Sequence, residues 1–443
     1  MCVVGSGPAG AVLALNLAEG GRTVLVLEAG PARPGARLAG PRAAARSSGP
    51  VVYPVATSRY RGLGGTSNLW TGGCPRLHPA DLGRNAYTPA DGGWPLAYEN
   101  LEPYYARAEL TLGVRGGRAD LPALDAPDSA RLRALLQGVG VTIVDPAVSA
   151  GLWGGDYFRV TRDLLPRLAP HPRVALLAGH AVTRLVPDAA GRITAAEIGD
   201  AAGRRRLVRA RTYVVAAGGL ETPRVLLLSR GPGHPDGIGN RHDRVGRGFM
   251  DHVKVSFRGC LRGRRLVGAG RSEQFYEDFK RRGLGSVILS VAAERRGRRG
   301  ALRISADVET YPCADNRVTL APDLPDGVGD PGLDLSVRLD ARDLRAIDAT
   351  RGLIRRIYAD LGAEDVAELP GEHGPVSWLS HHLGTCRMGN DPVTSVVDSD
   401  LRVHESPNLY VLGSAVFVTG GAANPTLTIV ALAHRLAERL AGR

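Results

Sequence analysis

The sequence contains no apolar run that approaches the roughly 20 residues a membrane-spanning helix needs. Its first residues, MCVVGSG, read as the start of a buried strand and not as a secretion signal. The five cysteines are odd in number and far apart, and no two form a CxxC pair, which argues against a disulfide framework or a zinc ribbon. We therefore expect a cytoplasmic protein with no membrane partner and no metal site.

Lysine is also scarce, because Lys254 and Lys280 are the only lysines among 56 basic residues. The formal net charge of +12 comes from arginines scattered along the chain, and aromatic residues make up only 5%. A nucleic-acid-binding surface more often combines one basic stripe with interleaved aromatic residues. We expect no nucleic-acid partner, although a basic, non-enzymatic binding protein remains an alternative. The arginine bias indicates a GC-rich genome.

The pattern of apolar residues predicts an α/β protein with two intertwined domains, since cores tend to divide beyond ~250–300 residues. Residues 2–4, 23–27, 211–217 and 408–412 are nearly continuous apolar runs, which is typical of parallel strands covered on both faces. Residues 254–340 alternate between apolar and polar, as in an antiparallel sheet with one wet face. Helices are predicted over 8–20, 222–229, 341–361 and 424–440.

A dinucleotide fingerprint opens the chain. Gly5, Gly7 and Gly10 form G-x-G-x-x-G between a strand and a helix, and Glu28 closes the next strand. In such a unit the glycines allow a tight turn and a close approach to a pyrophosphate, the helix N-terminus meets the phosphates, and the acid accepts from a ribose hydroxyl. The fingerprint does not choose between FAD and NAD, so an NAD-dependent dehydrogenase stays an alternative.

A second glycine-rich loop, RGLGGTSNLWTGG, covers residues 61–73. Glycines with small hydroxyl residues suit a backbone laid along a flat ring or a diphosphate. Trp70 inside this loop argues for a packed site and against a plain surface loop.

The end of the chain holds a histidine pair in SHHLGTCRMG at 380–389, and an Asn-Pro step in NLYVLGSAVFVTGGAANPTLTIVA at 408–431. An imidazole titrates near neutral pH and can take a proton from an alcohol. From its residue type alone, His381 is better interpreted as a buried structural histidine. Asn424 before Pro425 is also a good helix N-cap, so its amide has two competing roles.

Taken together, these motifs resemble the glucose–methanol–choline (GMC) oxidoreductase family, and within it the bacterial branch acting on sugars and sugar alcohols. The resemblance runs in order from Gly5 to Ala431 through GSGPAG, RGLGGTSNLW, VVAAGGLETPRVLLLS, VGRGFMDH, SHHLGTCRMG and the final NPTLTI segment. It implies a Rossmann-like FAD-binding domain over 1–80, 150–253 and 384–443. It also implies a discontinuous substrate-binding domain with cap segments, built on an antiparallel sheet, over 81–149 and 254–383.

The resemblance assigns roles to single residues. His381, three residues before a Gly-Thr pair, stands where the family has its base, and Asn424 stands at the partner position, with substrate contact and helix capping weighted equally. Leu69 replaces the histidine through which many relatives attach FAD, so non-covalent FAD is expected. The expected cofactor-binding residues are Gly5, Gly7, Gly10, Glu28, Gly64, Gly65, Asn68, Trp70, Val182, Ala217, Gly218, Gly413, Ser414, Pro425 and Thr426.

The implied activity is the oxidation of an alcohol CH–OH group to a carbonyl, by proton abstraction and hydride transfer to flavin N5. The implied substrate is a small polyhydroxylated molecule, namely a sugar, glycoside or aminosugar, and the electron acceptor is oxygen or another oxidant. The arginine-heavy composition makes an enzyme of antibiotic biosynthesis the narrower expectation. Glu405 stands where the family often has glycine, and no role is assigned to it.

Overall fold

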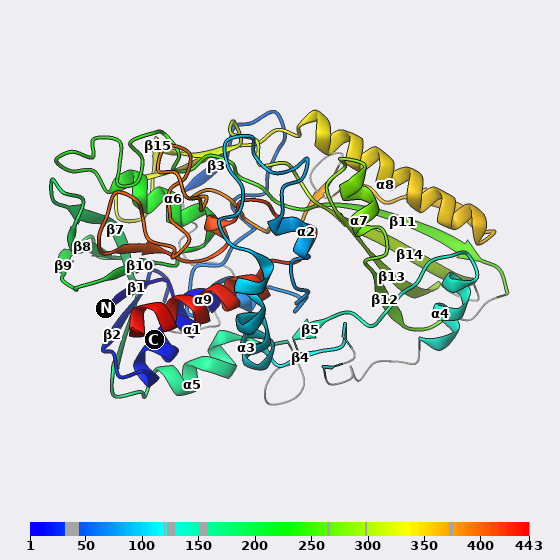
Figure 1. Cartoon of the computed structure of the whole chain (residues 1–443), viewed down its shortest axis with the longest axis horizontal. Coiled ribbons are helices and arrows are strands. Elements are labelled where there is room, and N and C mark those ends of the chain that lie inside the picture. Colours follow the sequence, from blue (N-terminus) through cyan, green and yellow to red (C-terminus); the bar gives the residue numbers. More distant parts are fainter. Residues whose placement is uncertain are drawn as a thin grey trace.

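The structure is a computed structural model that describes residues 1–31, 44–118, 120–121, 129–149, 157–263, 266–296, 299–371 and 376–442. Two lobes lie side by side along the longest axis of the molecule, and both chain ends lie in the same lobe (Figure 1). That lobe holds a parallel sheet with helices packed on it, and the other holds an antiparallel sheet. The predicted α/β fold, with a Rossmann-like part and an antiparallel part, is confirmed.

The parallel sheet has the strand order β19-β10-β1-β2-β6, and every neighbouring pair in it is parallel. These strands are short, and all but the edge strand β6 are strongly buried, as their continuous apolar runs predict. Their bounds are β1 Cys2–Val4, β2 Val24–Glu28, β6 Val174–Ala178, β10 Tyr213–Val215 and β19 Leu409–Val411.

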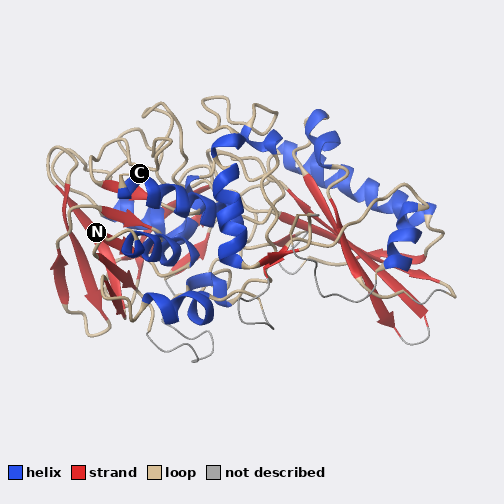
Figure 2. Cartoon of the chain, turned by 60° about the horizontal axis from the view of Figure 1, so that its bottom comes forward, coloured by secondary structure: helices blue, strands red, loops and turns tan. Residues whose placement is uncertain are grey.

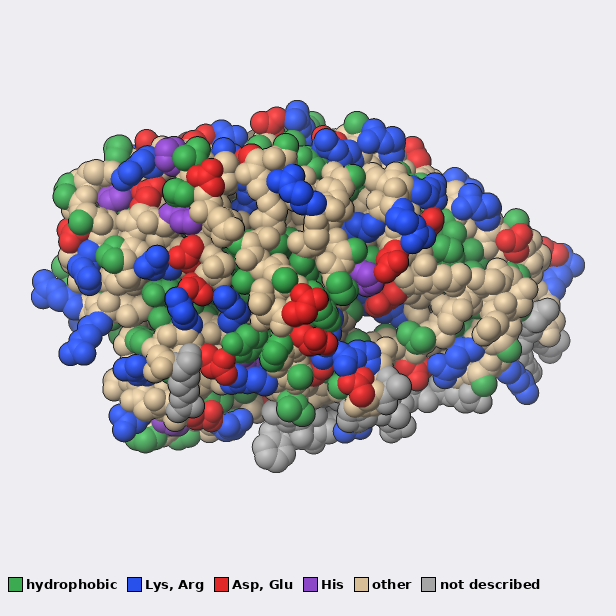
Figure 3. Space-filling view, in the orientation of Figure 1, with side chains coloured by type: hydrophobic (Ala, Val, Ile, Leu, Met, Phe, Trp, Pro, Cys, Tyr) green, Lys and Arg blue, Asp and Glu red, His purple; other side chains and the backbone are tan. Residues whose placement is uncertain are grey.

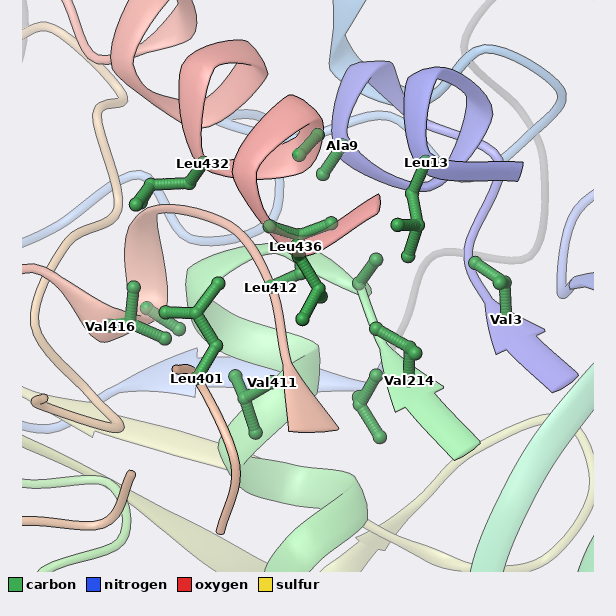
Figure 4. Packing of buried hydrophobic residues seen from close by; sticks show 14 of the residues in the cluster. Val3, Ala9, Leu13, Val214, Leu401, Val411, Leu412, Val416, Leu432 and Leu436 are labelled. Atoms are coloured by element: carbon green, nitrogen blue, oxygen red, sulfur yellow. The ribbon is translucent and has the colours of Figure 1, made fainter. Parts of the chain in front are cut away.

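Two helices from opposite ends of the chain pack together on this sheet. Helix α1 (Pro8–Glu19) is apolar nearly all round, and helix α9 (Thr426–Ala441) presents Leu432 and Leu436 to the core. Figure 4 shows Leu13 of α1 and Leu436 of α9 above Val214 and Val411 of the strands. The contact between α1 and α9 therefore brings the fingerprint and the last segment of the chain to the same lobe.

The antiparallel sheet of the second lobe has the order β12-β13-β14-β11-β17, with β18 also paired to β11. One face is covered by the long helix α8 (Ala341–Asp360), whose buried side chains contact β11 and β14 (Figure 2). The alternating burial along β11 matches the predicted pattern. The bounds are β11 Val253–Leu261, β12 Ala269–Ser272, β13 Val287–Arg296, β14 Arg299–Val308, β17 Glu364–Glu368 and β18 Ser377–Trp378.

Smaller elements complete the fold. A three-stranded meander consists of β7 His180–Pro187, β8 Ile193–Asp200 and β9 Arg205–Val208. Another small sheet consists of β15 Arg317–Pro325, β16 Pro331–Ser336 and β3 Ala45–Ser47. A two-stranded sheet pairs β4 Val114–Arg115 with β5 Val148–Ser149. The remaining α-helices are α2 Pro79–Leu82, α3 Glu102–Leu112, α4 Ala130–Gln137, α5 Leu165–Leu168, α6 Gly218–Leu228 and α7 Tyr276–Arg281.

Two predicted helix starts differ from the structure. Helix α6 begins at Gly218 and not at residue 222, so Gly218 and Gly219 form part of its first turn and Pro223 lies inside the helix. Helix α9 begins at Thr426 and not at residue 424, with Pro425 as its N-cap. The predicted domain boundaries stay a prediction.

Within the residues described, no helix is long and apolar enough to cross a membrane. The same residues contain no cluster of three or more His, Cys, Asp or Glu side chains that could hold a metal ion.

Candidate active site

The glycine fingerprint forms a tight backbone cradle at the start of α1. Gly5 has a φ of +102°, and a Cβ atom there would lie 2.5 Å from the carbonyl oxygen of Ala216. A Cβ on Gly10 would lie 2.0 Å from the carbonyl oxygen of Gly5, so strand and helix touch only because both residues are glycine. Gly7 is the N-cap of α1 and leaves that helix end without a side-chain cap. The first N–H groups of α1 and its dipole therefore suit a diphosphate.

Glu28 lies beside this cradle and is buried. Its carboxylate accepts hydrogen bonds from Ser6 N at 3.1 Å, Ser6 Oγ at 2.7 Å and Gly30 N at 2.9 Å. A carboxylate offers about four acceptor positions, so one remains for a ribose hydroxyl. These residues fit the adenosine half of a dinucleotide.

The second glycine loop lies directly against the first. A Cβ on Gly65 would lie 3.0 Å from Cα of Gly7, and Gly64 N donates to Ser6 Oγ at 3.2 Å. Gly64 has a φ of +83° and caps a short 3-10 helix, Gly65–Asn68. The side-chain amide of Asn68 donates to the carbonyls of Leu63 and Gly65, which holds the loop closed.

The same loop continues to the last segment of the chain. Trp70 donates its indole N–H to the carbonyl of Phe158 at 2.6 Å, so its ring is packed as predicted. A Cβ on Gly73 would lie only 2.9 Å from Oδ1 of Asn424. Residues 62–73 thus run from the nucleotide cradle to the Asn-Pro step, as a path for an extended cofactor requires. Leu69 offers no atom for covalent attachment.

The remaining predicted cofactor residues belong to strands, helix starts and turns of the same lobe. Ala217 is the N-cap of α6 and Gly218 its first residue, with a φ of +76°. Gly413, with a φ of +132°, precedes Ser414, whose hydroxyl donates to the carbonyl of His382 at 2.6 Å. Val182 is buried on β7; its contact with the adenine end stays a prediction.

His381 is held by two antiparallel segments, 249–253 and 378–384. Asp251, which is 1% exposed, accepts from the backbone N–H groups of Ser380 at 2.9 Å and His381 at 2.8 Å, and from the Tyr53 hydroxyl at 2.7 Å. Ser380 has a φ of +62°, a left-handed conformation that costs a side-chain-bearing residue about 1–2 kcal/mol. The bonds to Asp251 hold that turn and aim the next side chain, His381. Burial raises the pKa of Asp251 to about 7, and these donors oppose the rise.

The two ring nitrogens of His381 face two different groups. Its Nδ1 lies 2.8 Å from Nδ1 of His252, and its Nε2 lies 3.3 Å from Nδ2 of Asn424. Burial lowers the pKa of both histidines. For His381 the neighbouring His252 and His382, and after them Lys254 and Arg271, lower the pKa further and well below 6.5. Two neutral imidazoles at this distance must share one proton between the Nδ1 atoms.

The amide of Asn424 decides which tautomer His381 adopts. Arg271 Nη1, which can only donate, faces Oδ1 of Asn424 at 3.4 Å. The amide nitrogen of Asn424 therefore faces His381 Nε2 and donates to it. His381 then carries its proton on Nδ1, directed at His252, and keeps a lone pair on Nε2.

Asn424 lies outside helix α9 and does not cap it. The helix has Pro425 as N-cap, Thr426 as first residue and no side-chain cap hydrogen bond. The sequence left two roles open for Asn424, capping the helix and contacting the substrate. In the structure its side chain does not cap α9 and faces His381 instead.

His382, the neighbour of His381, points elsewhere. Its Nε2 lies 3.0 Å from Ser58 Oγ, and its ring packs against Tyr53 and Phe249. Burial, with Arg59 nearby, lowers its pKa to about 3.

Sequence reasoning missed three residues at this site, Asp251, His252 and Arg271. The first two end the VGRGFMDH motif, which was a usable signal, whereas Arg271 belongs to no motif. Glu405, to which no role was assigned, accepts hydrogen bonds from the backbone N–H groups of Gly239 and Arg241, and its carboxylate lies 3.1 Å from Nδ1 of His234. It therefore anchors a surface loop.

A dinucleotide cradle joined by one glycine loop to a half-buried histidine–asparagine pair defines a nucleotide-cofactor oxidoreductase. Residues 3–71 match an NAD(P)-binding Rossmann-like domain, and residues 150–254 and 312–433 match the family models of GMC oxidoreductases. The chain belongs to the GMC oxidoreductase family, and it is an FAD-dependent alcohol oxidoreductase. This assignment replaces both alternatives, the NAD-dependent dehydrogenase and the basic binding protein.

Similar proteins cover nearly the whole chain. It is 30% identical to 6'''-hydroxyparomomycin C oxidase of Streptomyces lividus, over 100% of this chain and 91% of the relative. It is 31% identical to paromamine 6'-oxidase of Streptomyces fradiae, over 99% of this chain and 91% of the relative. The crystal structure of pyridoxine 4-oxidase from Mesorbium loti has the same fold, with a TM-score of 0.70 and 19% identity over 100% of this chain and 99% of that one.

Proposed function

We propose that this enzyme oxidises a CH–OH group of a sugar, glycoside or aminosugar, with His381 as the base and Asn424 as the group that holds the reacting oxygen. The observation that carries this proposal is the paired geometry of the His381 ring, with Nδ1 facing His252 and Nε2 facing the Asn424 amide. The names of the two relatives from Streptomyces support a polyhydroxylated substrate and a role in antibiotic biosynthesis.

In this mechanism the substrate hydroxyl enters between His381 Nε2 and the Asn424 amide. The amide N–H donates to the hydroxyl oxygen, and Nε2 takes the hydroxyl proton. Bound FAD would supply the hydride acceptor for the same carbon, and a carbonyl would remain. His252 keeps the Nδ1 proton of His381 in place, which leaves the Nε2 lone pair directed at the substrate throughout.

One further feature fits the same reaction, and another bears on the compartment in which the enzyme works. The sixteen-residue helix α9 begins beside Asn424, and its N-terminal dipole favours negative charge at that end of the site. All five cysteines are free thiols, which supports a reducing, cytoplasmic setting.

The experiment that tests the proposal is anaerobic mixing of the purified yellow enzyme with a panel of sugars, glycosides and aminosugars. We expect at least one of them to bleach the flavin absorbance, and admission of air or an artificial acceptor to restore it. A flavin that no polyhydroxylated compound reduces, but that simple alcohols do, would overturn the substrate class.

The rate of flavin reduction should not depend on pH from the alkaline range down to 6.5. The pKa of His381 lies well below 6.5, so its Nε2 stays unprotonated over that range. A base with the ordinary pKa of 6.5 would be half protonated at that pH, and the rate would be halved. Stopped-flow measurements across this range distinguish a base with a lowered pKa from a base with the ordinary pKa. A loss of rate centred at pH 6.5 or above would contradict the assignment of His381 as the base.

A further inference from the structure

Arg271 is a buried cation with unused hydrogen-bond donors. It lies on β12 and is 6% exposed. Its Nη1 donates to Asn424 Oδ1 at 3.4 Å, and its Nε lies 3.3 Å from a carboxylate oxygen of Glu273, whose side chain is half exposed. Neither Nε nor Nη2 makes a hydrogen bond to any residue that the structure describes.

A buried guanidinium with unpaired N–H groups requires a hydrogen-bond acceptor. Arginine stays charged at all relevant pH values and carries five N–H donors in a planar fork that matches a carboxylate bidentately. Buried donors left without partners destabilise the folded protein, because they have lost their hydrogen bonds to water. The long contact with Asn424 and the single ion-pair contact with Glu273 leave Nη2 without any acceptor.

Arg271 lies next to the reacting position. Asn424 contacts Arg271 through its oxygen and His381 through its nitrogen, so one amide separates the guanidinium from Nε2 of His381. Lys254 and Arg271 both lower the pKa of His381, after the larger effects of burial and of the neighbouring His252 and His382. Lys254 has a partner, Asp307, at 3.7 Å.

The surface between the two lobes is hollowed, with basic, acidic and histidine side chains at the rim of the opening (Figure 3).

We propose that Arg271 is a substrate-binding residue and that the substrate is an acidic polyol, a sugar or glycoside bearing a carboxylate that pairs with the guanidinium. The proposal rests on the proposed function and narrows it, since the carboxylate is held while a hydroxyl of the same molecule faces His381 and Asn424. An ammonium group at the same place meets a buried cation and is repelled, so aminosugars are disfavoured.

The test compares three matched pyranoses on the FAD-loaded enzyme: D-glucuronate, D-glucose and D-glucosamine. Dissociation constants are obtained anaerobically, from perturbation of the flavin spectrum or from the concentration dependence of flavin reduction. We expect D-glucuronate to bind at least tenfold more tightly than the other two. Arg271→Gln should weaken D-glucuronate binding at least tenfold more than it weakens D-glucose binding.

Arg262→Gln is the matched control, because Arg262 is an exposed arginine of the same lobe and should leave all three constants unchanged. If Arg271→Gln does not retain FAD, Arg271→Lys keeps the charge without the planar fork of donors and should give an intermediate preference for D-glucuronate.

Equal binding of the acid and the neutral sugar, or an equal loss of affinity for both sugars in the variants, would overturn the proposal. Flavin reduction by neutral sugars without a preference for the acid would overturn it while leaving the proposed function intact. Tight D-glucuronate binding without reduction by any sugar would uphold Arg271 and count against the proposed function.

Discussion

Replacing His381 with alanine should slow anaerobic flavin reduction by about 10²–10⁴-fold while FAD remains bound. The imidazole is the group whose Nε2 lone pair faces the amide of Asn424, and its orientation is fixed from the other side by His252. Without it, the substrate hydroxyl has no acceptor for its proton as the hydride leaves. The cradle at Gly5–Gly10 and Glu28 is untouched, so the flavin content should stay the same.

The matched control is His171→Ala, in the turn before β6, where the imidazole accepts from the nearby backbone N–H of Arg173. This variant should reduce its flavin at the wild-type rate. Stopped-flow absorbance measures the rate, and the visible spectrum of the purified proteins measures the flavin content. Unchanged reduction in His381→Ala would remove this residue from the role of base, and loss of FAD would show a structural role instead.

The nucleotide half of the site could be predicted from the sequence because it depends on local geometry. The turn at Gly5, the contact of Gly10 with the strand and the acid at Glu28 all lie within one strand–helix–strand unit. A position that needs a positive φ, or that has no room for a Cβ atom, favours glycine. The glycine motif therefore predicts the local backbone structure.

The partners of His381 could not be predicted in the same way, because they come from distant strands. Asp251 and His252 meet His381 only through the antiparallel pairing of segments that lie about 130 residues apart. Arg271 reaches Asn424 from a strand of the other sheet. No local pattern records which side chains such pairings bring together.

The role of Asn424 shows how local and long-range preferences compete. Asn before Pro is a good cap by its local propensity. In the structure, Pro425 takes the cap position, and the Asn424 amide instead bridges His381 and Arg271. The tertiary partners decide the outcome, and they were not visible in the sequence.

A second large effect is expected far from the flavin, at one of the two lysines. Lys280 on α7 has a side chain that is 6% exposed, and its Nζ lies 2.8 Å from Asp81 Oδ1 and 2.8 Å from Glu309 Oε2, both fully buried. Burial opposes its charge, but these two carboxylates raise the pKa of Lys280 above its ordinary value, so it stays protonated. Glu309 also accepts from the backbone N–H of Gly421, three residues before Asn424.

Lys280→Met should therefore lower the free energy of unfolding by about 3–5 kcal/mol, since breaking a buried ion pair leaves an uncompensated charge. It should also slow flavin reduction, because the segment that carries Asn424 is attached to Glu309. Arg281→Met is the control: Arg281 is the next residue of the same helix, its side chain is 69% exposed, and its ion pairs with Glu277 and Asp278 lie at the surface, where such pairs contribute little. Urea unfolding of the two variants, measured side by side, gives the difference. Equal stability would mean that Asp81 and Glu309 do not need the lysine, either because they take up a proton or because water reaches them.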